Sequence, residues 1–424
     1  MNILFIHQNF PAQFKWLAPF LAKKGHVVKA LAITGQAIGS LTPINYPVKN
    51  KNTLGIHPLA LEFETKVIRG EACGLAMFQL KKTGFYPDLI VAHPGWGEIL
   101  FAKDIFPNSK LVNYIEFHYG KNSDGDFDPE FTNESLDDNF RLRVKNANNL
   151  LALDLMDAGI SPTHWQLSGV PREMQKKIRV IFDGIDTDRV KPNPNASLKI
   201  NLGKQSKFLE LSSTDEIITY VSRNLEPYRG YHSLLRSIPK ILAERKNTKV
   251  LIVGGDGVSY GAKAPQGQTW KKIFLDEIKD ETDLSRVIFL GKIPYESYLN
   301  LLQITKVHVY LTYPFVMSWS CIEAMSSGAL VVGSNTAPVR EFIQNGKNGV
   351  LVDFFNYPEI ASEVCKALEG GEIYDEMRLN ARKTIVDNFD LNTVCLPQQV
   401  EFLESLGPQN PEYKTDIEAP LIET

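Results

Sequence analysis

The 424-residue sequence has few cysteines, no long apolar run and little net charge, and each of these absences excludes a class of protein. Its four cysteines form no C-x-x-C pair and have no histidine at a ligand spacing, so the sequence predicts neither a zinc site nor a disulfide framework. No segment approaches the roughly 18 apolar residues of a membrane span, and the amino terminus lacks the features of a signal peptide. A net charge of −3 gives no indication of nucleic-acid binding. We therefore expect a soluble, cytoplasmic protein.

Short apolar runs alternate with helix-period segments along most of the chain. A parallel sheet with helices on both faces is typical of this alternation. The runs that predict strands are 2–7, 26–33, 89–92, 110–114 and 177–182 in the first half, and 217–223, 249–255, 286–291, 307–312 and 329–332 in the second. The length allows two domains of about 200 residues each. The predicted fold is α/β, with two Rossmann-like, doubly wound parallel-sheet domains facing a cleft.

The domain boundary is predicted near Pro192, because the segment 181–199 is dense in Gly, Asp, Asn and Pro. We expect a first domain over 1–191 and a second over 192–385. A helical segment, 386–407, is expected to cross back to the first domain, and the polar, proline-punctuated residues 408–424 are expected to form a loose tail.

Side chains that can take part in acid–base chemistry follow the predicted strands of the first half. His7 follows the first strand, His93 opens the turn H-P-G-W-G-E, and Glu116 and His118 stand in E-F-H-Y-G. Ligands of such sheets bind beyond the carboxyl ends of the strands, and either an imidazole or a carboxylate can accept a proton there. The alternative for each histidine taken alone is a structural role.

Two arginines in Y-V-S-R-N-L-E-P-Y-R-G are placed to converge at a strand end in the second half. Arg223 ends the strand and Arg229 stands six residues later, before a helix. Guanidinium groups match phosphate oxygens in pairs. The alternative is two surface arginines beside a turn.

The segment 313–341 is expected to form a loop, a helix, a strand and a second loop. The backbone amides of Ser318, Trp319 and Ser320 would open the helix and suit a phosphate, because the amino-terminal end of a helix is positive. Glu323 lies about one turn inside the helix, within reach of a ribose diol. The alternative for Glu323 is a surface carboxylate.

The run PFVMSWSCIEAMSSGALVVGSNTAPVRE within this segment resembles the nucleotide-sugar signature of retaining glycosyltransferases of the GT-B fold, the family 4 type. In the usual pattern, E-x7-E, the first acid binds the donor sugar and the second holds the ribose. The second acid maps onto Glu323, but the first falls on Phe315, which is a departure from the pattern. The resemblance covers nearly the whole chain and implies the GT-B architecture.

Further roles follow from this resemblance alone. It implies that His118 lies beside the reactive carbon, with Glu116 as the competing proton acceptor and the His93 turn facing the sugar and acceptor. It also implies that Arg223 and Arg229 hold the donor diphosphate, with an arginine where the family has a lysine. The remaining implied nucleotide contacts are a glycine-rich turn and main-chain contacts to the base, at Gly254, Lys292 and Ile293.

The acidic, turn-rich residues 121–138 allow two interpretations, a mobile lid or acceptor loop and a plain solvated connection. Asp124, Asp126 and Asp128 form a D-x-D-x-D pattern, but no EF-hand spacing follows. The resembling enzymes usually need no metal, so we expect neither a metal nor a cofactor.

The sequence as a whole predicts a retaining glycosyltransferase. Its donor would be a UDP- or GDP-sugar and its acceptor a glycan, a lipid-linked or a small molecule, in polysaccharide or glycoconjugate biosynthesis. The apolar and lysine-bearing helix at 14–24 leaves peripheral contact with the inner face of a membrane as an alternative to core packing. Two other functions remain open, a GT-B sugar-nucleotide epimerase and a non-catalytic nucleotide- or glycan-binding protein, the latter motivated by Phe315.

Overall fold

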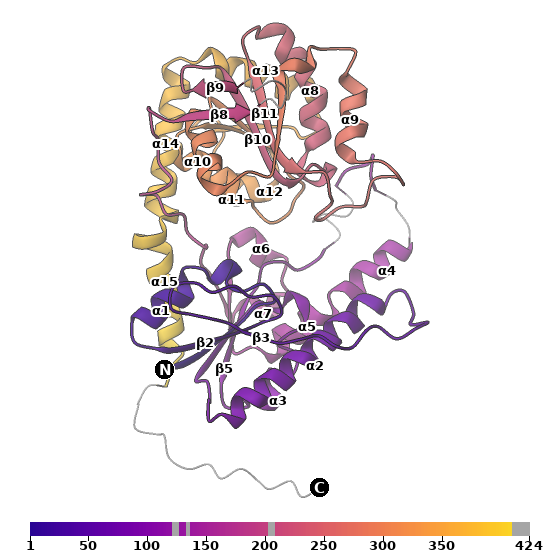
Figure 1. The fold of residues 1–424 in the computed structure, drawn as a ribbon, viewed down its shortest axis with the longest axis vertical. Helices are drawn as coiled ribbons and strands as arrows, with labels where there is room; N and C mark the ends of the chain where they lie inside the picture. The colour runs from indigo at the N-terminus through magenta and orange to yellow at the C-terminus, as the bar shows by residue number, and fades with distance from the viewer. Residues whose placement is uncertain (121–126, 133–135, 202–207, 409–424) are drawn as a thin grey trace, which may run out of the picture.

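The chain forms two α/β domains, one above the other in Figure 1, in a computed structural model that describes residues 1–120, 127–132, 136–201 and 208–408. Each domain is built on its own parallel sheet. The predicted fold class is confirmed. The residue limits of the domains stay predictions, and the predicted tail lies outside the described residues from 409 onward.

The first domain holds a seven-stranded sheet in the order β3-β2-β1-β4-β5-β6-β7 with every pair parallel. Its central strands are buried on both faces because helices cover both sides of the sheet. The strands are β1 (Asn2–Ile6), β2 (Val27–Ala32), β3 (Ile44–Asn45), β4 (Leu89–Ala92), β5 (Lys110–Tyr114), β6 (Ala158–Ser161) and β7 (Ile178–Val180).

The helices of the first domain are α1 (Leu17–Lys23), α2 (Leu61–Lys82), α3 (Ala102–Ile105), α4 (Leu136–Lys145), α5 (Ala147–Leu155), α6 (His164–Ser168) and α7 (Arg172–Gln175). Phe14, Leu17 and Leu21 are buried in the core against β1. The apolar face of this segment therefore packs inside the protein. No described helix combines the length and the apolar character needed to cross a membrane.

The second domain repeats the plan with the strand order β12-β11-β10-β13-β14-β15. These strands are β10 (Ile217–Asn224), β11 (Lys249–Gly255), β12 (Val287–Gly291), β13 (Val307–Tyr310), β14 (Leu330–Ser334) and β15 (Val350–Val352). The covering helices are α8 (Tyr231–Glu244), α9 (Trp270–Ile278), α10 (Tyr295–Ile304), α11 (Trp319–Ser326), α12 (Ala337–Arg340), α13 (Tyr357–Glu369) and α14 (Glu372–Phe389). An antiparallel pair, β8 (Ser197–Asn201) with β9 (Phe208–Ser212), precedes the sheet and was not predicted.

Both sheets reverse their strand order at one point. In the first domain β1 lies between β2 and β4, and in the second β10 lies between β11 and β13. The loops after these strands diverge to opposite faces of the sheet and leave a crevice, which is where doubly wound sheets bind ligands. The two crevices face each other, because the loop after β5 contacts the loop after β13 through Phe117 and Phe315, whose ring centroids lie 4.7 Å apart.

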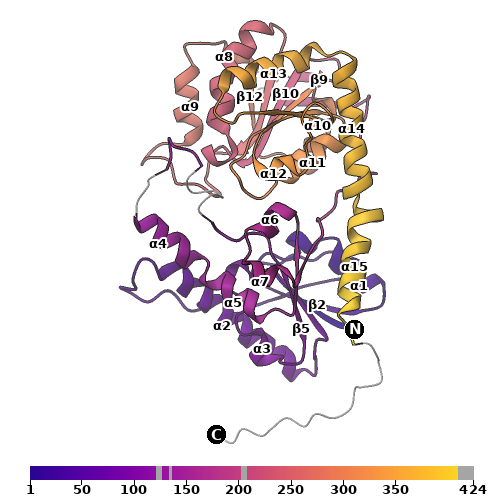
Figure 2. The ribbon, with the colours of Figure 1, turned by 180° about the vertical axis from the view of Figure 1, so that it is seen from behind.

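The end of the chain returns to the first domain. Figure 2 shows α14 beside the second domain and α15 (Leu396–Ser405) beside the first. Val400, Phe402 and Leu403 of α15 are buried in the core that also holds Ile3 and Phe5 of β1. The chain crosses between the domains twice, at 185 and at 391, and these two passages are joined by a pair of backbone hydrogen bonds of 2.9 and 2.8 Å.

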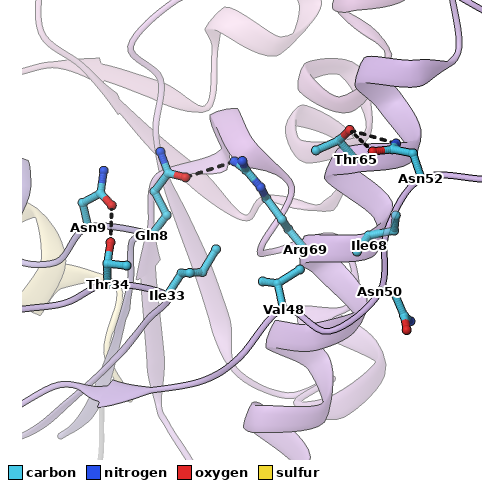
Figure 3. A pocket seen from close by; sticks show the side chains of 10 residues that line it. All are labelled: Gln8, Asn9, Ile33, Thr34, Val48, Asn50, Asn52, Thr65, Ile68 and Arg69. Atoms are coloured by element: carbon cyan, nitrogen blue, oxygen red, sulfur yellow. Dashed lines mark hydrogen bonds between the residues drawn. The ribbon is translucent and has the colours of Figure 1, made fainter.

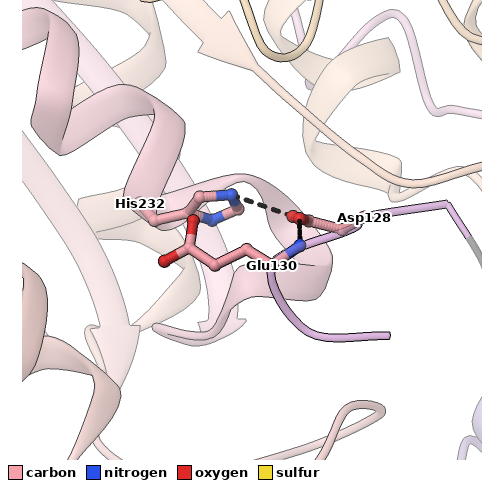
Figure 4. A group of neighbouring side chains, drawn as sticks. All are labelled: Asp128, Glu130 and His232. Carbon is pink, nitrogen blue, oxygen red and sulfur yellow. Dashed lines mark hydrogen bonds and ion pairs between the residues drawn. The ribbon is translucent and has the colours of Figure 1, made fainter. Parts of the chain in front are cut away.

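The acidic segment 121–138, which follows β5 in the first domain, is only partly described. Asp124 and Asp126 lie outside the described residues. Asp128 is 2% exposed, and its carboxylate lies 3.0 Å from His232 Nε2 (Figure 4). It also accepts from the Tyr313 hydroxyl at 2.8 Å, and both partners belong to the second domain. Glu130 forms an ion pair with Arg236 at 2.6 Å. The interpretation as a solvated connection is therefore wrong for 127–132, which dock onto the second domain.

Two aromatic rings extend this docked segment. Phe127 packs against Tyr313, Phe354 and Phe355, and Phe131 packs against His232, Trp270 and Phe274. Asp128, Glu130 and His232 bring their ligand atoms within 4.8 Å of one another. The carboxylates of Asp128 and Glu130 already have partners in the protein. Through these contacts the cluster attaches the segment 127–132 to the second domain.

His308 makes the stability of the second domain sensitive to pH. It is fully buried in β13, with Nδ1 2.9 Å from the Thr219 hydroxyl, and burial lowers its pKa to about 3. As pH falls below 6.5 the unfolded chain binds a proton that the folded chain does not, so folding loses about 1.4 kcal/mol per pH unit from this residue until pH 3. His308→Gln is expected to reduce by this amount the slope of the unfolding free energy measured in urea between pH 6 and 4. The exposed His57→Gln is the matched control, and equal slopes for His308→Gln and the unaltered protein would contradict the expectation.

Candidate active site

The first domain carries an acid held by two donors at its crevice. His93 Nε2 lies 3.1 Å from Glu116 Oε2, and Gln13 Nε2 donates to Glu116 Oε1 at 3.1 Å. His93 Nδ1 accepts from the amide of Gly95 at 3.2 Å, so the ring proton stands on Nε2 and is donated to Glu116. Burial acts to raise the pKa of Glu116, but the hydrogen bonds from His93 and Gln13 hold it below its ordinary value. The Glu116 carboxylate is therefore charged at neutral pH.

His7 lies behind this pair and has a structural environment. Its ring meets those of His93 and Trp96 edge-on, at centroid distances of 5.4 and 5.1 Å, and its Nδ1 accepts from the Asn9 amide at 2.9 Å. Burial, and then the neighbouring His93, lower its pKa to about 3. His7 is accordingly a neutral ring that supports the loop after β1.

His118 lies beside the pair of His93 and Glu116 and has a buried ring nitrogen without a hydrogen-bond partner among the described residues. Together with His93 and Glu116 it lines a cavity of about 20 Å³, which is room for one water molecule. Its Nε2 is buried and has no hydrogen-bond partner in the described part of the chain. Burial lowers its pKa, so the imidazole is neutral at pH 7 and able to accept a proton. The structure thus brings together the three residues predicted to be catalytic, whose roles stay predictions.

The carboxyl group of Asp183 connects the two domains, and it was not predicted from the sequence. Asp183, after β7, accepts from the Tyr114 hydroxyl at 2.5 Å and from the Trp319 indole at 3.0 Å, and burial raises its pKa to about 6. Lys15 Nζ lies 4.1 Å from the centre of the Trp319 ring. Trp319 was predicted for its backbone amide, but its side chain joins the domains. Asp183 was not predicted because it stands in the segment 181–199, whose composition is typical of an interdomain linker.

Glu323 is buried between α11 and α10. It is 6% exposed, and its two oxygens accept from the hydroxyls of Tyr295 at 2.6 Å and Tyr298 at 2.7 Å. Burial raises its pKa, against these hydrogen bonds and the positive charges of Lys15 and Arg189. The interpretation as a surface carboxylate is wrong. Each oxygen of an ionised carboxylate has a second lone pair, so Glu323 retains acceptor capacity for a hydroxyl of a ligand.

The backbone amides at the start of α11 are partly engaged within the protein. The amide of Ser318 donates to the Tyr310 hydroxyl at 2.8 Å, and the amide of Ser320 donates to the Ser318 side chain at 3.3 Å. These two amides would have to exchange partners to bind a phosphate as predicted. Ser318 is the amino-terminal cap of α11, and its short polar side chain explains why the helix begins at Trp319.

The two arginines meet at the ring of Tyr260. The guanidinium carbons of Arg223 and Arg229 lie 5.7 and 5.2 Å from its centre. Arg223 is exposed, but Arg229 is 7% exposed and donates from Nη1 to Thr312 Oγ1 and to the Val316 carbonyl, both at 2.9 Å. The alternative of two surface arginines is therefore wrong for Arg229, which also holds the loop after β13.

Phe315 lies in an aromatic cluster at the boundary of the two domains. Its ring centroid is 4.9 Å from Tyr228 and 4.8 Å from Tyr260, and the Arg229 guanidinium lies 5.3 Å above it. Phe117, next to His118, completes the cluster from the first domain. The position of the first acid in the E-x7-E pattern is thus occupied by an apolar contact that joins the two crevices.

The glycine-rich turn after β11 has a structural explanation. A Cβ on Gly254 would lie 2.7 Å from Leu225, so close packing requires a glycine there. The buried Glu226 accepts from the amides of Ser259 at 3.0 Å, Tyr260 at 3.2 Å and Gly261 at 3.0 Å. These donors, which a phosphate loop would present to a ligand, are taken by Glu226. Lys292 and Ile293 follow β12 at the same edge of the sheet.

Two family descriptions match the chain, and they divide it as the fold does. Residues 24–190 match "Glycosyl transferase family 4 group" and residues 203–384 match "Glycosyl transferases group 1". The chain belongs to the family 4 type of GT-B glycosyltransferases. The residues of the E-x7-E run and of the paired arginines fall within the second match.

Curated relatives of this family 4 chain include an uncharacterized glycosyltransferase of Methanocaldococcus jannaschii, 21% identical over 51% of this chain and 50% of its own. A D-inositol 3-phosphate glycosyltransferase of Rhodococcus jostii is 25% identical over 42% of this chain and 36% of its own. The chain spans about half the length of the curated relatives it matches.

Solved structures resemble the chain over nearly its whole length. Sucrose-phosphate synthase of Thermosynechococcus elongatus superposes with a TM-score of 0.70 at 18% identity, covering 96% of this chain and 99% of its own. The Anabaena protein HepE, solved with UDP and glucose, gives 0.65 at 18% identity, covering 96% and 100%. At such identities the likeness shows the GT-B fold.

Proposed function

We propose that this protein is a retaining glycosyltransferase, which moves a sugar from a nucleoside diphosphate sugar to a hydroxyl of a glycan, lipid-linked or small-molecule acceptor. We place it in polysaccharide or glycoconjugate biosynthesis. The observation that carries the proposal is the buried Glu323, held by two tyrosines at the crevice of the second domain with Arg229 in the neighbouring loop. Membership of the family supports the transfer, and the UDP bound by HepE supports UDP as the nucleotide.

The proposed mechanism divides the work between the two crevices. Glu323 binds the ribose diol, and the charges of Arg223 and Arg229 stabilise the diphosphate as it leaves. Positive charge that develops on the sugar is offset by the charged Glu116 of the first domain. The neutral His118 accepts the proton of the acceptor hydroxyl.

Phe315 supports a second candidate, a protein that binds a nucleotide sugar without transferring it. The ring occupies the position at which the family places an acid for the donor sugar, and it brings no hydrogen-bond acceptor there. The two candidates share the nucleotide site and differ in turnover, so a single experiment separates them.

The experiment is a thermal-shift screen with UDP-, GDP-, ADP- and CMP-sugars, followed by assay of diphosphate release with and without lipid and glycan extracts. We expect stabilisation by a UDP-sugar and release that depends on an acceptor. Binding with no release in any extract would favour the second candidate, and binding of no nucleotide would contradict both.

Glu323→Ala tests the site itself. It is expected to weaken UDP binding about tenfold to a hundredfold, because hydrogen bonds to charged groups contribute about 1.5–3 kcal/mol. Isothermal titration with UDP measures the effect. Glu372→Ala removes an exposed acid of the same domain and is the matched control. An unchanged affinity in Glu323→Ala would remove Glu323 from the proposal.

A further inference from the structure

A separate cavity of about 320 Å³ lies in the first domain, at the edge of the sheet where β1 and β2 end (Figure 3). Its walls come from the residues after β1, the residues after β2, the loop that precedes α2, and α2 itself. Its volume is within the range of small-molecule sites. No function proposed so far uses this cavity.

Three polar side chains at one end of the cavity, Gln8, Asn9 and Arg69, present hydrogen-bond donors, whereas Asn50 and Asn52 use their amide nitrogens on Glu71 and Glu64. Arg69 donates from Nη1 to Gln8 Oε1 at 3.0 Å, and the Thr34 hydroxyl donates to Asn9 Oδ1 at 2.7 Å. Each of the two amide oxygens thus already accepts one hydrogen bond, and Figure 3 shows the amide nitrogens turned to the same side. A ligand that fits this set must supply acceptors.

Arg69 gives the cavity a positive charge. Burial raises the pKa of Glu98 although the charge of Arg69 acts to lower it, and Glu98 does not line the cavity. Over the described ranges of the chain Arg69 takes part in no ion pair. Glu64 and Glu71, the nearby acids of α2, bind Thr53 and Asn50 instead and do not line the cavity. An anion is therefore the ligand group that Arg69 suits, because a guanidinium binds the two oxygens of a carboxylate or phosphate together.

The lining also includes three apolar side chains, and His7 links the cavity to the candidate active site. Ile33, Val48 and Ile68 offer a surface for the carbon face of a ring. Gln8 directly follows His7, whose ring lies 5.4 Å from that of His93, the partner of Glu116. A ligand held here that reached past His7 would extend from Glu116 and His93 toward the outer edge of the sheet.

We propose that this cavity holds the acceptor by an anionic group, so that the acceptor is a polyhydroxyl compound that carries a phosphate or carboxylate. The anion binds Arg69 and the amide nitrogens of Gln8 and Asn9, and the carbon face of the ring packs on Ile33 and Val48. That the bound molecule is the sugar acceptor rests on the proposed function, whereas the anion site rests on the cavity alone. A phospholipid headgroup and a soluble sugar phosphate share this chemistry.

The test compares charged and uncharged probes that share a carbon skeleton, on the full chain. Isothermal titration uses glucuronate against glucose and glycerol 3-phosphate against glycerol. We expect the charged member of at least one pair to bind ten or more times tighter, and Arg69→Ala to remove that preference. Arg172→Ala, at an exposed position of the same domain, is the matched control and should keep it. Vesicles of phosphatidylinositol against phosphatidylcholine distinguish a lipid source, since Arg69-dependent binding to the former alone would assign it.

Equal binding of charged and uncharged probes, no binding of any probe, or a preference that survives in Arg69→Ala would each overturn the proposal. UDP affinity, which does not involve Arg69, reports whether the variant is folded. If Arg69→Ala loses UDP binding, Arg69→Gln repeats the test with the charge removed and a hydrogen bond to Gln8 retained. Failure of the unaltered protein to bind UDP would contradict the proposed function but would leave the charge preference to decide this proposal.

Discussion

Replacing His118 by alanine is expected to lower turnover about a hundredfold or more while the affinity for UDP stays unchanged. A general base contributes roughly 10²- to 10⁴-fold to a reaction. Burial keeps the pKa of His118 below 6.5, and its Nε2 has no partner in the portion of the chain that the structure describes. Its ring shares a small cavity with Glu116, so a water molecule or an acceptor hydroxyl there lies beside both groups.

The measurement is kcat and KM for donor and acceptor together with the dissociation constant of UDP. We expect the fall in kcat to exceed any change in donor KM. The rate should also decline below pH 6.5 as the imidazole becomes protonated, and this limb should be absent from the variant. His164→Ala, an exposed histidine of the same domain, is the control.

Unchanged turnover in His118→Ala would remove His118 from the mechanism. Glu116 would then be the remaining proton acceptor, and Glu116→Gln would carry the loss instead. In that substitution the amide cannot accept a proton, although it can still hydrogen-bond to His93 and Gln13. Because Glu116→Gln also removes the charge that the mechanism places beside the sugar, the result for His118→Ala assigns the base: a loss of turnover assigns it to His118, and unchanged turnover assigns it to Glu116.

The paired variants Arg229→Ala and Arg223→Ala are expected to differ in stability although both weaken nucleotide binding. Arg229 is buried, and its removal leaves Thr312 Oγ1 and the Val316 carbonyl without their donor. We expect a loss of about 3 kcal/mol in unfolding free energy, because breaking buried hydrogen bonds to a charged group is costly. Arg223 is exposed, and its replacement should change stability by about 0.5 kcal/mol at most.

Urea unfolding measures the first effect, and titration with UDP measures the second. Binding of UDP should be abolished in Arg229→Ala, where charge and loop are lost together, and should weaken about tenfold in Arg223→Ala, where one charge-assisted hydrogen bond is lost. Arg229→Lys keeps the charge and tests whether the forked geometry matters. Equal stability of the two alanine variants would show that Arg229 does not hold the loop after β13.

Strong local signals made the two sheets predictable. Leu89–Ala92 and Lys110–Tyr114 are strands with the predicted limits, because apolar runs buried on both faces are a pattern within single segments. The strand β6 (Ala158–Ser161) was not predicted, since its sequence AGIS contains a glycine and a serine and only one large apolar side chain. The sequence likewise predicted that His93 and Glu116 follow strands, where they can act on a ligand. It did not predict the hydrogen bond between the two.

The sequence by itself determined the class of fold, the division into two halves and the helix that carries Glu323, because each depends on residues that are neighbours in the chain. Only the tertiary structure decided which of these groups are buried and with what partners. Glu323 is buried by tyrosines 28 and 25 residues away, and Asp128 by a histidine of the other domain. Arg69 meets Gln8 across 61 residues. Burial and pairing depend on contacts between distant segments. These contacts set the charge of each group, and they leave Arg69 without an ion pair among the described residues.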